Sequence, residues 1–172
     1  MKAARARRLA LFTTAWALAV IDLALKAGAR HALTEPVDLH ILQLRLAYNT
    51  GAAFSLGDAL PTGTVLAATG IITVAMAAYG WRAAPTANRG QRLAGAAVLG
   101  GAAGNVIDRA TYGAVTDYLH TGWWPTFNLA DVFIVCGVAL LLLTTWRASS
   151  RPVHRQAEAV SEQGQQRPRV DT

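Results

Sequence analysis

Four long apolar stretches constrain the fold of this chain more than any other feature of its sequence. They cover roughly residues 9–27, 61–81, 93–109 and 129–146. A helix of about 20 apolar residues crosses a hydrocarbon core of about 30 Å. The third stretch is the shortest, because its apolar part ends at Ile107, and it needs its flanks to complete a span. The pattern predicts an all-α polytopic membrane protein with four transmembrane helices.

The amino-acid composition agrees with a membrane protein. Hydrophobic residues make up 53% of the 172 positions and charged residues only 15%, whereas a soluble domain typically carries about 25% charged residues. The alternative is a soluble helical bundle with an unusually apolar core. The gathering of the apolar residues into stretches of span length favours the membrane.

Basic residues are unevenly distributed around the predicted spans. They precede the first span, lie between the second and third, and follow the fourth: Lys2, Arg5, Arg7, Arg8, Arg82, Arg89, Arg92, Arg147, Arg151, Arg155, Arg167 and Arg169. The other side of the membrane receives only Lys26, Arg30, Arg45 and Arg109. The positive-inside rule then predicts cytoplasmic termini and two outer loops. The net charge of +6 is therefore a topology signal, and we expect no nucleic-acid partner.

The outer segment between the first two spans, residues 30–59, is not predicted to be helical. In residues 42–48, apolar side chains alternate with Gln43, Arg45 and Ala47, which is the two-residue period of a strand with one apolar face. Residues 49–51, Asn-Thr-Gly, follow as a turn. We expect a small extracytoplasmic β-strand cradle, a short strand or hairpin, on the membrane surface.

The sequence provides no pattern for metal or disulfide chemistry. Its one cysteine, Cys136, falls within the fourth span, where a small packing residue is expected. The four histidines are scattered, without the spacing of a metal site. We therefore expect no metal ion and no organic cofactor.

Polar residues in or beside the spans are few. Asp22 and Lys26 are four positions apart, so they share a helix face and can form an ion pair. Asn105, Asp108 and Arg109 lie together at the outer end of the third span. Arg109 can pair with Asp108 or extend its charged end to the interface. In the same span Gly100 and Gly104 form a small-xxx-small step, which favours close helix packing.

Two further carboxyls, Asp117 and Asp131, flank the short loop between the third and fourth spans. Short connections keep helix ends adjacent, so we expect the two side chains to meet at the outer surface. Two carboxyls at hydrogen-bonding distance share a proton, and such a pair can activate water. Asn128 lies one helical turn before Asp131, and it can bond that carboxyl, bind a substrate or cap the helix. A proton relay is the alternative use of carboxyls at membrane depth.

Five blocks of the sequence resemble the signatures of bacterial lipoprotein signal peptidase (signal peptidase II). They occur in that family's order: Asp22-Leu-Ala-Leu-Lys26, Asn49-Thr-Gly-Ala-Ala-Phe-Ser55, Gly100-Gly-Ala-Ala-Gly-Asn-Val-Ile-Asp-Arg109, Val115-Thr-Asp-Tyr118 and Phe127-Asn-Leu-Ala-Asp131. The Asn49 block is weak by itself, whereas the set of blocks in four spans is specific. Thr116 is a departure, because members often have valine there.

The resemblance implies an aspartic endopeptidase of the bacterial inner or cytoplasmic membrane, with its active site at the extracytoplasmic face. Such enzymes remove signal peptides from prolipoproteins, cutting on the N-terminal side of a cysteine that carries diacylglyceryl. The implied partners are these precursors and membrane lipid, and we expect a monomer. Residues 1–147 would form one integral-membrane peptidase domain, and residues 148–172 a disordered polar cytoplasmic tail.

By motif, Asp117 and Asp131 match the catalytic pair. The residues that match the surroundings of the substrate channel are Asn49, Gly51, Asn105, Arg109, Asn128 and Ala130. Asp22 and Lys26 match a structural or substrate-facing pair on the first helix. Asp108 is expected to support Arg109 and Asn105.

Two other classes of protein make different predictions. A small proton-coupled transporter would place its carboxyls near the middle of the membrane, whereas Asp117 and Asp131 fall at the outer interface. A non-catalytic anchor or assembly factor leaves the cluster of acidic and asparagine residues without a purpose.

Overall fold

The computed structural model describes residues 1–51 and 61–149. Two parts of the expectations lie outside these residues: Ala52-Ala-Phe-Ser55 of the second block, and nearly all of the polar tail. The described chain forms four helices, α1 (Lys2–Ala32), α2 (Thr62–Ala83), α3 (Arg89–Tyr112) and α4 (Leu129–Ser149). It also forms three strands, β1 (Val37–Asp38), β2 (Gln43–Asn49) and β3 (Val115–His120).

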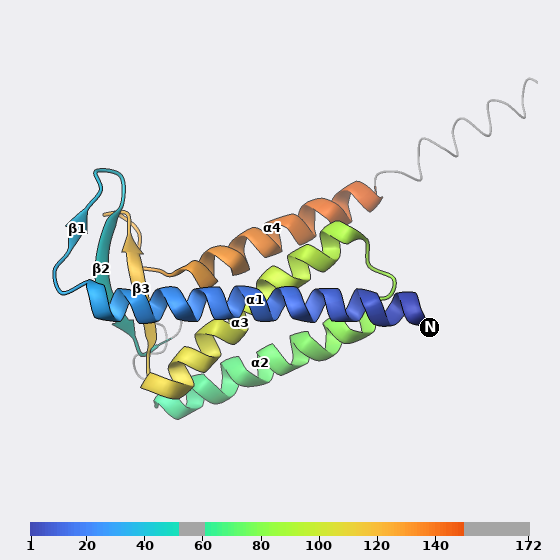
Figure 1. Cartoon of the computed structure of the whole chain (residues 1–172), viewed down its shortest axis with the longest axis horizontal. Coiled ribbons are helices and arrows are strands. Elements are labelled where there is room, and N and C mark those ends of the chain that lie inside the picture. Colours follow the sequence, from blue (N-terminus) through green and yellow to red (C-terminus); the bar gives the residue numbers. More distant parts are fainter. Residues whose placement is uncertain (52–60, 150–172) are drawn as a thin grey trace, which may run out of the picture.

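The helices form an elongated bundle around α3, with the sheet at one end and the N-terminus at the other (Figure 1). α3 packs most extensively on α4 and α1, and less on α2. Glycines permit the closest approaches. A Cβ atom at Gly100 would lie 2.6 Å from the carbonyl oxygen of Ala15 on α1, and one at Gly104 would lie 2.6 Å from Asp22. The predicted small-residue step is therefore a real contact between α3 and α1.

Three helices are long and apolar enough to cross a membrane: α1, α2 and α4. α3 is not among them, because its many glycines and its polar residues lower its hydropathy. It is nevertheless a helix of 24 residues, longer than predicted at both ends. It begins at a capping box between Asn88 and Gln91 and ends at Gly113, whose positive φ of 76° suits glycine. Large apolar side chains of α2 and α4, Ile71 and Leu142 among them, are exposed on the bundle surface.

The sheet is antiparallel in the order β1-β2-β3. The strand predicted between the first two spans is confirmed as β2, and it forms a hairpin with β1. The sequence predicts no strand at residues 115–120, which it places only beside the third span. β3 pairs with β2 in a register that places Asp117 opposite Ala47 and Val115 opposite Asn49. The sheet thereby joins the connection between α1 and α2 to the connection between α3 and α4.

Candidate active site

Asp117 and Asp131 line the same cavity, of about 500 Å³, at the sheet end of the bundle. Asp117 comes from β3 and Asp131 from the first turn of α4. The other polar lining includes four of the sequence-predicted residues: Asn49, Gly51, Asn105 and Arg109. The rest of the wall is largely apolar and includes side chains of α2, α3 and α4. The structure thus brings the two acids to one cavity, as the short connection between the third and fourth predicted spans indicates.

Asn128 joins the two carboxyls. Its side-chain amide donates to Asp117 Oδ1 at 2.6 Å, and its backbone N–H donates to Asp131 Oδ2 at 3.0 Å. In return, Asn128 Oδ1 accepts the backbone N–H of Asp131 at 3.1 Å. The reciprocal bonds between Asn128 and Asp131 form a capping box at the start of α4. Of the three uses considered for Asn128, the helix cap is present in this fully buried residue, and the backbone N–H bonds the Asp131 carboxyl while the side-chain amide bonds that of Asp117.

Asp117 is 3% exposed, and its environment favours the neutral acid. Burial is the main cause that raises the pKa of Asp117, to about 7, and the charge of nearby Asp131 adds to the rise. Hydrogen bonds from Asn128 and Asn49 act in the opposite direction. A proton on Asp117 is therefore available near neutral pH.

Asp131 accepts a hydrogen bond at each oxygen. Asn105 Nδ2 donates to Asp131 Oδ1 at 2.9 Å, opposite the bond from the backbone of Asn128. Lys26 Nζ donates to Asn105 Oδ1 at 2.6 Å. That bond occupies the amide oxygen of Asn105, so the amide nitrogen faces the carboxylate. Asn105 is thereby an orienting partner of Asp131.

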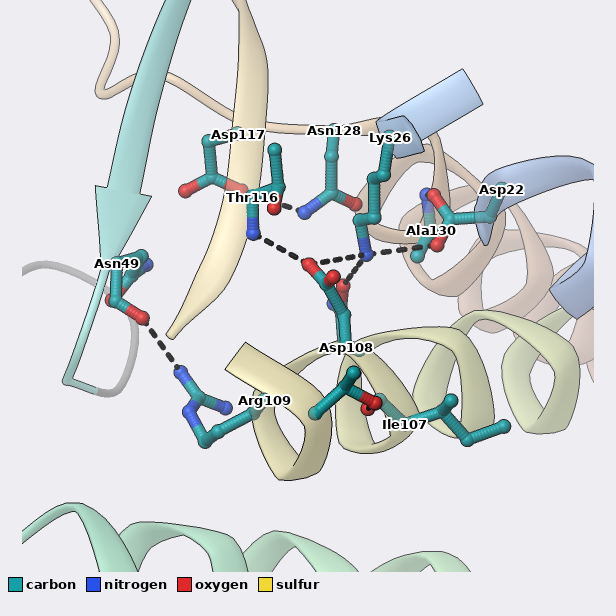
Figure 2. Close-up of polar contacts among 12 residues, drawn as sticks. Asp22, Lys26, Asn49, Ile107, Asp108, Arg109, Thr116, Asp117, Asn128 and Ala130 are labelled. Atoms are coloured by element: carbon teal, nitrogen blue, oxygen red, sulfur yellow. Dashed lines mark hydrogen bonds and ion pairs between the residues drawn. The ribbon is translucent and has the colours of Figure 1, made fainter. Parts of the chain in front are cut away.

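The ion pair predicted between Asp22 and Lys26 is present, at 2.8 Å, and both side chains are fully buried. Figure 2 shows Lys26 between Asp22 on its own helix and Asp108 on α3, 3.9 Å away. Asp22 Oδ1 also accepts the backbone N–H of Ala130 at 2.9 Å. This bond connects α1 directly to the first turn of α4, where Asp131 lies.

The position of Asp108 differs from the expectation that it supports Arg109 and Asn105. Its carboxylate forms ion pairs with Lys26 and Arg30 and accepts the backbone N–H of Thr116 at 2.6 Å. It is therefore a partner of α1 and β3. The physical reason is that Asp108 lies on the face of α3 that packs against α1, where two cations approach it.

Arg109 does not extend to the interface, and its ion pair with Asp108 is not found among the described residues. It is buried, and Nη2 donates to the backbone oxygens of Gly51 at 2.6 Å and Asn49 at 3.3 Å (Figure 2). Its Nε has no hydrogen-bond partner within the described ranges. Arg109 thus fixes the end of β2 and also lines the cavity.

Sequence reasoning assigned no role to Arg30. The available signal was its spacing, since residues 22, 26 and 30 follow one another at four-residue steps on one face of α1. Within residues 1–51 and 61–149, no group of three or more histidine, cysteine or acidic side chains is arranged to hold a metal ion.

Comparison with protein families gives a match over residues 14–147 to the family described as signal peptidase (SPase) II. A lipoprotein signal peptidase of Rhodococcus jostii is 38% identical, over 81% of this chain and 73% of its own length. One from Syntrophomonas wolfei is 42% identical over 59% of this chain, and the match covers 66% of that protein, just under two thirds. One from Vibrio cholerae is 40% identical over 64% of this chain and 68% of its own length.

The fold is similar to that of a bacterial membrane enzyme solved by the in meso method at 2.3 Å resolution. The TM-score is 0.71 at 26% sequence identity, and the match covers 83% of this chain and 91% of the other.

Proposed function

The chain belongs to the signal peptidase II family, the proteases that remove signal peptides from prolipoproteins, and we propose that Asp117 and Asp131 perform this hydrolysis as an aspartic pair. The observation that carries the proposal is Asn128, which bonds both carboxyls at the edge of one cavity. An amide that donates to one acid and orders the other holds the pair in a fixed geometry, as catalysis requires.

The mechanism assigns opposite roles to the two acids. Asp131, as the carboxylate, takes a proton from a water molecule, whose oxygen attacks the scissile carbonyl carbon. Asp117, as the neutral acid, donates its proton to the carbonyl oxygen, so the tetrahedral intermediate forms without a free oxyanion. Collapse of the intermediate breaks the C–N bond, and the amine leaves with a proton from the pair. The raised pKa of Asp117 supports this assignment.

The substrate backbone would be held by donors beside the pair. Arg109 has a buried Nε without a partner among the described residues, and it lies in the same cavity. Asn49 lies at the end of β2, and the hairpin of β1 and β2 would form one wall of the cradle. Four other residues would act indirectly, by fixing α1, α3, β3 and the start of α4 around the acids: Asp22, Lys26, Ala130 and Asp108.

The apolar signal helix would lie between the spans. A second cavity of about 610 Å³ is lined mostly by apolar side chains of α2, α3 and α4. It shares the lining residues Ile72, Met76 and Val98 with the cavity of the acids, so the two cavities are adjacent. A peptide helix in this space would present its end to Asp117 and Asp131.

The proposed topology has four transmembrane helices, with α3 crossing inside the bundle. Both termini would be cytoplasmic, and the sheet end would be extracytoplasmic. Residues 1–147 would be the peptidase domain and residues 148–172 a cytoplasmic tail. Cleavage would occur on the N-terminal side of a cysteine whose diacylglyceryl chains remain in the lipid, and one copy of the chain would be sufficient.

The purified protein can be tested with a precursor that carries diacylglyceryl on its cysteine and with the same precursor unmodified. We expect cleavage of the modified precursor alone. Asp117→Asn and Asp131→Asn should each fold, insert and lose cleavage by at least about a thousandfold, because each removes a proton-transfer group and with it the action of the pair. Glu35→Gln is the matched control, because it removes an exposed carboxylate away from the cavity. Turnover at the wild-type rate by either aspartate variant would refute the pair.

A further inference from the structure

We propose that Arg30 is a positioning residue for this hydrolysis: it fixes β3 through Thr116 and Asp108, so that Asp117 is held against Asp131. The inference rests on the proposed function of the two acids. It concerns a residue in the last turn of α1, outside the lining of the cavity, whose contacts are with Asp108, Thr116 and Tyr112.

One nitrogen of Arg30 contacts two other elements. Nη1 donates to Asp108 Oδ1 on α3 at 2.9 Å and to Thr116 Oγ1 on β3 at 2.7 Å. The guanidinium also lies over the ring of Tyr112, 4.0 Å from its centroid, which is the geometry of a cation–π contact. Arg30 therefore joins the ends of α1 and α3 to β3.

Asp108 completes the same unit. Its Oδ1 accepts from Arg30, and its Oδ2 accepts the backbone N–H of Thr116 at 2.6 Å. Asp108 and Thr116 are both fully buried, and the Arg30 side chain is 16% exposed. Charge-assisted hydrogen bonds in such a setting are stronger and shorter than neutral bonds. The backbone of β3 is thus fixed at the residue immediately before Asp117.

The bond between the backbone N–H of Thr116 and Asp108 takes the place of a strand partner on the side of β3 that faces away from β2. β3 is an edge strand, since the sheet order is β1-β2-β3. On the side away from β2, the C-terminal half of β3 pairs with Phe127, which bonds Tyr118 and Leu119. On the same side, the N-terminal half of β3 has the carboxylate of Asp108 as its partner. Neighbouring side chains of a strand point to opposite faces, so Thr116 is held on one face of β3 while Asp117 is directed from the other.

The hydrogen bond between Arg30 and Thr116 also accounts for the threonine at position 116, where members of the family often have valine. The side chain is fully buried, and a buried hydroxyl requires a hydrogen-bond partner. Arg30 provides it. In this chain the hydroxyl beside Asp117 is therefore one end of a specific bond between two residues that lie 86 positions apart.

The test is a double-mutant cycle of Arg30→Met, Thr116→Val and both together, assayed on the diacylglyceryl-modified precursor. A small displacement of a catalytic group costs up to about a hundredfold in rate. We expect Arg30→Met to lower kcat about 10- to 100-fold, with KM within about twofold of the wild-type value and little change in melting temperature. Arg30→Lys should recover part of kcat, because the ammonium can still bind Asp108. Arg5→Met is the matched control, since it removes an exposed arginine at the opposite end of α1.

The cycle separates positioning from a general loss of structure. Thr116→Val should reduce kcat when Arg30 is present and have little further effect when Arg30 is replaced, because removing both partners leaves no unpaired group. Wild-type kcat in Arg30→Met, additive effects of the two changes, or a fall in kcat that follows the loss of folded protein would each overturn the inference. Failure of the wild-type protein to cleave the precursor would instead refute the proposed function itself.

Discussion

At the scale of single residues, the site is built from side chains that each have more than one partner. Asn128 caps α4 and bonds both acids, and Lys26 bonds Asp22, Asp108 and Asn105. Such sharing makes the effects of substitutions in this cluster non-additive. A substitution that removes one group therefore changes the geometry of its neighbours as well.

Replacing Asn128 by alanine should separate the two acids. Asp117 would lose its donor at 2.6 Å, and α4 would lose its side-chain cap. We expect kcat to fall about 100-fold, in the range found for misplaced catalytic groups, and stability to fall by about 1 kcal/mol for the cap. Kinetics on the lipidated precursor and thermal unfolding would measure the two effects. Asn88→Ala, which removes the capping side chain of α3 far from the acids, should reproduce only the loss of stability. A full rate in Asn128→Ala would contradict the bridging role.

Asp117 should make the stability of the protein depend on pH. Because its pKa is raised from 3.8 to about 7, the folded state binds a proton that the unfolded state releases more readily. This contribution is fully present below about pH 4 and is lost as the pH rises through about 7. The Asp117→Asn side chain cannot ionise, so the variant does not lose this contribution. The melting temperature of the variant minus that of wild type should therefore increase between pH 4 and pH 8. A difference that is constant with pH would show that Asp117 titrates normally.

At the scale of elements, the sequence predicted the helices and β2 but not β3. The helices have long apolar stretches, and β2 alternates apolar and polar side chains. β3 has neither a long apolar stretch nor an alternating pattern. Its residues 115–118 are all buried, so buried and exposed side chains do not alternate along it. Its partner β2 also lies about 70 positions earlier in the chain, so without a local pattern only the tertiary pairing defines this strand. The site residues were found by motif, whereas the role of Arg30 required the packing of α1 on α3.

The contact between α3 and α4 depends on glycine. A Cβ atom at Gly101 would collide with the carbonyl oxygen of Ala130 and lie 2.9 Å from Ile134. Gly101→Ala should therefore displace the start of α4, which carries Asp131, and destabilise the protein by about 1–3 kcal/mol. Gly70→Ala is the matched control in α2, because nothing lies within 4 Å of its added Cβ. Equal melting temperatures and equal activity in the two variants would show that α4 adapts to the added methyl group.

At the scale of the whole molecule, the sidedness of the bundle decides which face meets the substrate. The sheet end and the N-terminal end lie at opposite ends of the long axis (Figure 1). Basic residues gather near the N-terminal end, where Arg7 and Arg8 bond backbone oxygens that follow α2 or lie in its last turn. The proposed topology places this end of the bundle in the cytoplasm.

That topology can be measured with single cysteines, because Cys136 is the sole cysteine of the chain. In a Cys136→Ser background, Trp123→Cys in the loop after β3, where the side chain is 81% exposed, should react with a membrane-impermeant maleimide added to intact cells. Ala87→Cys, between α2 and α3, should react only after the membrane is opened. Labelling of both positions from the same side would contradict four spans, because α3, which lies between the two positions, would then not cross the membrane.

The pairing of β2 with β3 has a consequence for biosynthesis. The ribosome releases β2 early, but β3 follows only after α2 and α3, and Asp131 emerges later still with α4. The growing chain consequently lacks the proposed pair of Asp117 and Asp131 while its first three helices are synthesised. If the proposed pair is correct, translation order alone would keep the nascent chain inactive until its last helix is made.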